Sequence, residues 1–170
     1  MPIIFAASPT IAILARFSLV LAISLTWASA VEDTYRLVPQ LSVGTSGFEP
    51  GVALEWRSTR FSSVIVRPEV FLSDGRHPGA GGAVLYDFSH DLALPLRHAI
   101  AAGPRAVYHN SDDRSWEAGG LGTYSYDLSS GPKSWRHSVG ALAALGVIQE
   151  NHPDEMTVGL TLGAFYAFGF

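Results

Sequence analysis

The chain contains no cysteine, which excludes disulfide bonds, thiolate metal sites and a cysteine nucleophile. Charged residues are also scarce, at 15% of the 170 residues, and the eleven basic ones are scattered along the chain. Because fifteen residues are acidic, the net charge is −4, which provides no electrostatic footprint for nucleic acid. After residue 30 the sequence has no run of about 18 apolar residues, so helical membrane spans are excluded there.

Residues 1–30 have the layout of a secretory signal peptide. Their one charge, Arg16, is followed by the apolar run 17–27 and by the small residues Ala28, Ser29 and Ala30. An N-terminal membrane helix is the alternative, but the run after Arg16 is too short to span and the run before it is interrupted by Pro9. We expect cleavage after Ala30, which leaves residues 31–170 as a single domain with ten basic and fifteen acidic side chains.

The last fifteen residues, M-T-V-G-L-T-L-G-A-F-Y-A-F-G-F, alternate with a period of two. Small or polar residues occupy one parity, except for Phe165, and the other parity is apolar throughout: Val158, Leu160, Leu162, Ala164, Tyr166, Phe168 and Phe170. This pattern predicts a β-strand with one apolar face. Such a face is too large for an exposed edge in water, whereas a tilted strand of about 9 to 11 residues crosses a bilayer. The alternative is the last strand of a soluble sandwich or lipocalin-like barrel.

A terminal strand that ends in Tyr166, Phe168 and Phe170 resembles the C-terminal signature of Gram-negative outer-membrane β-barrels. In that family the signature is an assembly signal, read by the barrel assembly machinery. At the level of pattern the resemblance covers residues 31–170 and extends to small barrels of the outer membrane protein A type. It implies a monomer in the bacterial outer membrane with both termini periplasmic. Its surroundings would be outer-membrane lipid and lipopolysaccharide.

Alternating segments separated by Gly, Pro, Ser, Asn and Asp clusters continue along the mature chain, which predicts an all-β fold. We expect an eight-stranded antiparallel transmembrane β-barrel with strands at residues 34–45, 51–58, 63–73, 82–89, 97–109, 115–128, 135–149 and 156–170. With both ends in the periplasm, the segments 46–50, 74–80, 110–114 and 150–155 would be the extracellular hairpins. Three strands contain a proline (Pro39, Pro68 and Pro104), which requires a bulge or a local bend.

The charges distinguish lipid from water as the surrounding solvent. All the charged residues in strand interiors share the more polar parity: Arg36, Glu55, Arg57, Arg67, Glu69, Asp87, Arg105, Glu117, Asp127 and Arg136. A soluble barrel would instead turn its apolar face inward and its charges outward. Aromatic residues such as Trp56, Tyr108 and Trp116 gather near strand ends, as in the girdles of membrane barrels. We therefore expect these ten charges to form a paired network in the lumen, with Glu55, Arg57, Arg67 and Glu69 on neighbouring strands as one local set.

No catalytic, cofactor or metal site is predicted. His109 and Ser111 have the H-x-S spacing found in barrels that deacylate lipid A, but the pair lies in mid-chain without the glutamate that follows it in that family. The residues Asp112, Asp113, His152, Asp154 and Glu155 could together bind a divalent ion, although solvated loop charges explain them more simply. The glycine-rich segments 79–82 and 119–122 precede no predicted helix, which argues against phosphate binding.

Three function classes remain open. An eight-stranded barrel leaves an interior that side chains just fill, which favours a structural or surface-interaction role. Small inward residues such as Ala99, Gly103 and Gly140 leave a narrow or gated pore for small solutes as the first alternative. A lipid A-modifying enzyme is the second alternative.

Overall fold

The computed structural model describes residues 34–45, 47–57, 63–110, 115–129, 137–149 and 156–169. The predicted signal peptide, Arg136 and Phe170 lie outside these residues. Eight strands are present in them: β1 (Thr34–Gly44), β2 (Gly47–Arg57), β3 (Val64–Ser73), β4 (His77–Asp87), β5 (His98–His109), β6 (Ser115–Asp127), β7 (His137–Gln149) and β8 (Met156–Gly169). Within the described ranges, no helix has the length and apolarity needed to cross a membrane.

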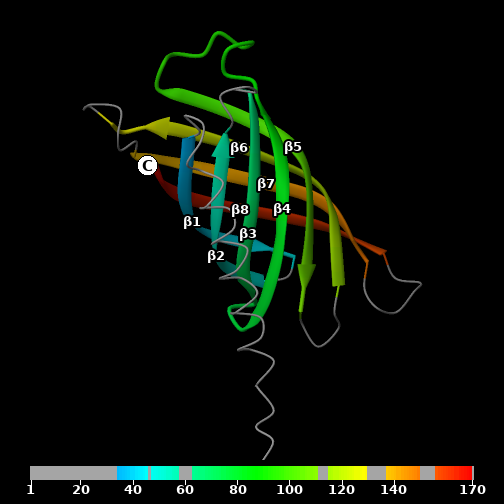
Figure 1. Ribbon diagram of the computed structural model, residues 1–170. Helices are drawn as coiled ribbons and strands as arrows, with labels where there is room; N and C mark the ends of the chain where they lie inside the picture. Colours follow the sequence, from blue (N-terminus) through cyan, green and yellow to red (C-terminus); the bar gives the residue numbers. More distant parts are fainter. Residues whose placement is uncertain are drawn as a thin grey trace, which may run out of the picture. The chain divides into compact units, whose positions relative to one another are not determined.

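Each strand pairs antiparallel with the next, and β1 pairs with β8 to close the barrel (Figure 1). The predicted fold class, an eight-stranded antiparallel barrel, is therefore confirmed. The first residue of β1 and the last residue of β8 lie at one end, which we call the terminal rim, since Arg36 is opposite Gly169. The opposite rim carries the β1–β2, β3–β4, β5–β6 and β7–β8 connections.

The two faces of each strand differ in burial as the period of two predicts. Large outward residues such as Leu41, Val43 and Val158 are 58 to 67% exposed, whereas inward charges such as Arg67 and Glu69 are at most 4% exposed. No Asp, Glu, Lys or Arg lies on the outward face of any described strand. The chain thus folds with its apolar band outside and its charges inside.

Two of the predicted hairpin loops are wrong, because both are largely strand. Residues 47–50 belong to β2, and residues 77–80 belong to β4. In the β3–β4 turn, Asp74 and Gly75 both have positive φ, at 49° and 65°, and the amide of Arg76 donates to the carbonyl of Ser73 at 3.1 Å. Only three residues, 74–76, connect β3 and β4, and positive φ at successive turn residues matches strand twist, so the strands extend further than the Gly and Pro residues suggest.

Prolines interrupt the pairing without shifting it. Between β3 and β2 the ladder skips two pairs, at Pro68 and at the neighbouring Arg67, and resumes in the same register at Val66 and Trp56. Similar gaps occur beside Pro39 in the β1–β8 ladder and beside Pro104 in the β4–β5 ladder. Proline has no N–H to donate, so one ladder bond is absent at each site. Because the register is unchanged, these ladders contain no bulge at the prolines.

Inward phenylalanines cover glycines on neighbouring strands. Phe165, which interrupts the small and polar parity of β8, lies opposite Gly140, where an added Cβ would be 2.2 Å from the ring. In the same way Phe71 covers Gly79, where the added Cβ would be 2.4 Å away. These rings fill space in the lumen that the glycines leave empty.

Candidate functional site: the polar interior of the barrel

Arg67 lies at the centre of the interior and is fully buried. Its guanidinium donates to Glu55 on β2 and to Gln40 on β1. It also lies 5.6 Å from the ring centroid of Phe165, within cation–π range. Three different strands therefore hold this one cation.

Glu69 and Arg105 extend the network from the centre towards the opposite rim. The Nε2 of Gln40 donates to Glu69 Oε2 at 3.1 Å, and Arg105 Nε donates to Glu69 Oε1 at 2.6 Å. Arg105 Nη1 also lies 3.3 Å from Glu117 Oε1 on β6. Arg105 is thus shared by two carboxylates, those of Glu69 and Glu117, so acidic groups outnumber basic groups in this half of the interior.

His109 lies between acidic side chains near the opposite rim. Its Nε2 is 3.4 Å from Glu117 Oε2, its Nδ1 is 3.3 Å from Ser73 Oγ, and Nδ1 is 4.0 Å from Glu49 Oε1. Phe71 packs edge-on against the imidazole with ring centroids 5.1 Å apart. The Oε1 atom of Glu49 is buried and makes no hydrogen bond with the described part of the chain.

Ser73, His109 and Glu117 bring together a hydroxyl, an imidazole and a carboxylate, which are the components of a hydrolase triad. Their burial decides whether a substrate could reach them. Ser73 is 4% exposed and His109 is 2% exposed. Within the described residues the Ser73 hydroxyl is therefore closed off from solvent, and the cluster is a packed part of the interior.

A second set of contacts lies towards the terminal rim. Arg36 pairs with Glu55 at 3.3 Å and donates to Ser138 on β7. Arg57 donates to Asp87 Oδ2 at 2.5 Å, and Asp87 also accepts from the amide of Ser89 at 2.9 Å. Charges at this rim are more exposed than those at the centre, since the side chain of Arg57 is 35% accessible.

Together the contacts form one continuous chain through the lumen. The chain runs through Ser138, Arg36, Glu55, Arg67, Gln40, Glu69, Arg105, Glu117, His109 and Ser73. It connects β1, β2, β3, β5, β6 and β7. We call it the lumen network. Polar side chains thus fill the interior along its height.

The predicted charges are only partly brought together. Glu55 and Arg67 pair with each other, but Arg57 pairs with Asp87 and Glu69 pairs with Arg105, so the predicted local set is divided among three contacts. Asp127 accepts from the amide of Ser129 at 2.8 Å near the terminal rim.

The predicted network left out eight polar residues that are buried in the described interior. They are Gln40, Ser42, Glu49, Ser73, His109, Ser115, Ser138 and Thr161. Gln40 and Ser138 already lay on the inward parity but carry no charge, and Glu49 had been placed in a loop. An examination of every polar residue on that parity could have found them.

The other motifs contribute little to this site. His109 faces the lumen, whereas its H-x-S partner Ser111 lies outside the described residues. The loop residues Asp112, Asp113, His152, Asp154 and Glu155 lie outside them too. In the part of the chain that the structure describes, no three His, Cys, Asp or Glu residues are arranged to hold a metal ion.

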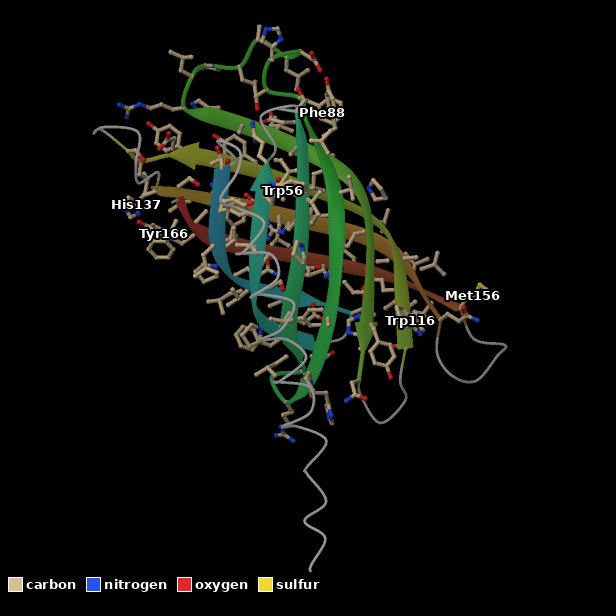
Figure 2. The ribbon with its side chains drawn as sticks, in the orientation of Figure 1. Trp56, Phe88, Trp116, His137, Met156 and Tyr166 are labelled. Carbon is tan, nitrogen blue, oxygen red and sulfur yellow. The ribbon has the colours of Figure 1, made fainter. Side chains whose placement is uncertain are left out.

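Aromatic residues on the outer face gather towards both rims (Figure 2). At the terminal rim, the hydroxyl of Tyr166 lies 2.8 Å from His137 Nδ1, and Phe168 packs edge-on against Tyr166 at 4.6 Å. At the opposite rim, the rings of Tyr108 and Trp116 are in contact, with their centroids 4.9 Å apart. Of the predicted assembly signal, Tyr166 and Phe168 thus lie on the outer face of β8.

Comparisons with known proteins do not identify the chain. No protein-family model matches the sequence, and no curated protein is significantly similar to it. Among solved structures, the chain is similar to the crystal structure of Neisserial surface protein A (NspA), with a TM-score of 0.45 and 12% identity. The similarity covers 81% of this chain and 94% of that one. A likeness of this degree does not assign a function, and the resemblance to the outer membrane protein A type stays a prediction.

Proposed function

We propose that this chain is an outer-membrane β-barrel with a closed interior and a structural or surface-interaction role. The observation that carries the proposal is the lumen network, which lies inside a barrel whose outer face is apolar. A barrel in water would bury Leu41, Val43 and Val158 and expose its charges, the reverse of what is found.

Strand dimensions support a position in a bilayer. The eight strands are 10 to 14 residues long, which is enough for tilted strands to cross the hydrocarbon core. The aromatic contacts near each rim suit the two membrane–water interfaces. As part of the proposal, residues 1–30 direct export, the termini are periplasmic, and outer-membrane lipid and lipopolysaccharide surround the barrel.

A closed lumen favours the structural role over the pore. Arg67, Glu69, Arg105 and Glu117 are each at most 8% exposed, so side chains occupy the section through which a solute would pass. Their contacts would have to break before ions could cross, and separating buried pairs is costly, at about 3 to 5 kcal/mol each.

Three measurements test this proposal. In fractionated cells the protein should be found with outer membranes, and after purification it should migrate faster unheated than boiled on a detergent gel. In planar bilayers it should show no steady conductance, because the lumen network fills the interior. Recovery of the protein in the soluble periplasm would refute the membrane assignment, and steady conductance of the folded protein would instead support the pore.

A further inference from the structure

The outward residues at mid-height differ between the two halves of the barrel. On β1 to β3 they are mostly large, for example Leu41, Val52 and Val66, whereas β4 carries both Gly82 and Val84 there. On β5 to β7 they are small, and the outward positions on adjacent strands are Ala102 and Pro104, Gly120 and Gly122, and Ala141 and Ala143. One facet of the apolar band is therefore hollow.

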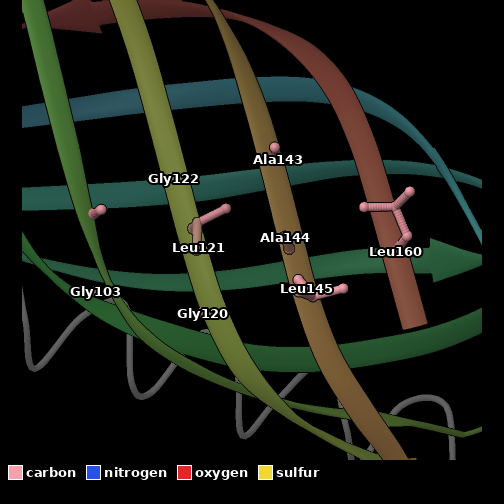
Figure 3. Close-up of a pocket in the computed structure, with 9 residues that line it drawn as sticks. Gly103, Gly120, Leu121, Gly122, Ala143, Ala144, Leu145 and Leu160 are labelled. Carbon is pink, nitrogen blue, oxygen red and sulfur yellow. The ribbon is translucent and has the colours of Figure 1, made fainter. Parts of the chain in front are cut away.

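A groove of about 470 Å³ occupies this facet (Figure 3). Gly120 and Gly122 form its floor on β6, with Ala102 on β5 and Ala143 on β7 beside them. Leu145 and Leu160, which are 60% and 50% exposed, project at its β7–β8 side. The lining is apolar, as the hydrocarbon region requires.

The barrel itself does not require glycine at the floor of this groove. A Cβ added at Gly120 or Gly122 would meet its nearest atom at 3.8 Å, an ordinary contact, and neither residue has a positive φ. Inward Gly103 differs, because an added Cβ there would lie 2.0 Å from a backbone carbonyl oxygen. Glycine in a strand weakens it and often marks the close approach of another molecule. Here that molecule would lie outside the barrel.

Polar groups lie at the terminal-rim end of the groove, and a basic residue is next to them in the chain. On the outward face of β6, Gly120 and Gly122 are followed by Tyr124, whose hydroxyl lies 2.7 Å from Nδ1 of His98. With the hydroxyl donating to Nδ1, the imidazole Nε2 carries a proton and can donate to a phosphate oxygen. Arg97, which precedes His98, is exposed and adds a positive charge. These groups complement an anionic headgroup, and the groove complements an acyl chain.

We propose that this facet binds one glycerophospholipid, with an acyl chain along Gly120 and Gly122 and its phosphate at His98 and Arg97. The inference rests on the proposed membrane position of the barrel. A slender acyl chain fits the facet better than a second copy does, because two identical hollows placed face to face would not fill each other. The charge at one end also orients the lipid, which a plain hydrocarbon surface would not do.

Titration with phosphatidylglycerol, followed by native mass spectrometry of the detergent-solubilised full chain, tests the proposal. We expect one lipid to be retained by the wild type. The double variant G120V/G122V should need at least tenfold more lipid for half-saturation, because the two added side chains occupy the groove and the Cβ atom has room at both positions. The R97Q/H98F variant should also bind more weakly. V52L, which changes an outward residue of β2, four strands away from β6, is the matched control and should behave as the wild type.

Each variant is first checked for the faster migration of the unheated barrel, so that a folding defect is not mistaken for lost binding. Equal lipid retention by the wild type and a folded G120V/G122V variant would overturn the proposal. A wild-type dimer that becomes monomeric in G120V/G122V would identify a second copy as the occupant and would also overturn it. If the wild type itself forms no compact membrane barrel, the proposed function fails together with this inference, and the gel distinguishes that result.

Discussion

Arg67 shows that a charged side chain on the inward face needs partners around it. A buried guanidinium is tolerated only when opposite charges and acceptors surround it, and here Glu55, Gln40 and the Phe165 ring do so. Glu69 has the same need with the opposite sign and receives hydrogen bonds from Gln40 and Arg105. The interior charges are therefore mutually dependent, and removal of one leaves a partner uncompensated.

The first prediction at this scale concerns Glu69. Glu69→Ala should lower the free energy of unfolding by about 3 to 5 kcal/mol, because it leaves Arg105 with one fewer buried partner. Urea titration of the barrel in detergent micelles measures this loss. Arg57→Ala is the matched control and should cost much less, since that side chain is 35% accessible to solvent. Equal losses in the two variants would show that burial of the pair is not the cause.

The second prediction concerns a turn glycine. Gly75 has a φ of +65°, so Gly75→Ala places a Cβ in a left-handed backbone and should destabilise the barrel by about 1 to 2 kcal/mol. Gly120→Ala is the control, because its added Cβ has room and its φ is not positive. It should leave the urea midpoint unchanged or raise it. A larger loss at Gly120 than at Gly75 would contradict this assignment of strain.

At the scale of elements, β8 has two tasks. Its outward face completes the apolar band, and it pairs with both β7 and β1 to close the barrel. Its aromatic end at the terminal rim packs against His137, with Phe168 at 5.7 Å and Tyr166 at 5.9 Å between ring centroids. The strand that closes the barrel is thus also the strand that carries the predicted assembly signal.

The third prediction separates these two tasks. The double change of Phe168 and Phe170 to Ser should reduce the amount of protein in outer membranes, because it removes the aromatic signature. Changing Val158 and Leu160 to Ser removes comparable apolar surface from the same strand but leaves that signature intact. Immunoblots of membrane fractions compare the two variants. Normal membrane levels of the Phe168 and Phe170 variant would count against the assembly signal.

At the scale of the whole molecule, each strand runs antiparallel to the next, so successive connections lie at opposite rims of the barrel. Asn110 follows β5 at the opposite rim, and Ser129 follows β6 at the terminal rim. If the termini are periplasmic, residues near Asn110 face the outside of the cell. Because the chain has no cysteine, a single introduced thiol reports on one position only.

The fourth prediction tests this orientation. In intact cells a membrane-impermeant maleimide should label Asn110→Cys, and it should label Ser129→Cys only after the outer membrane is permeabilised. The cysteine-free wild type is the control for background labelling. The reverse pattern would place the termini at the cell surface.

The sequence by itself determined the number of strands and the face of the residues within the predicted strands, because a period of two is a local property of an extended chain. It placed Arg67, Glu69 and Arg105 inside and Leu41 and Val158 outside, as the structure has them. Its errors lay at the hairpins, where glycine and proline within β2 and β4 were read as loop because a tight turn uses fewer residues than their composition suggests.

Only the tertiary structure decided which charges meet. Parity assigns a side chain to the lumen but not to a height or a neighbour, and these depend on the tilt and stagger with which eight strands close. Glu69 therefore meets Arg105, two strands away, rather than the nearer Arg57, and His109 joins Glu117 and Ser73. The hollow facet on β5 to β7 also appears only when the strands are side by side, since its small residues are far apart in the chain.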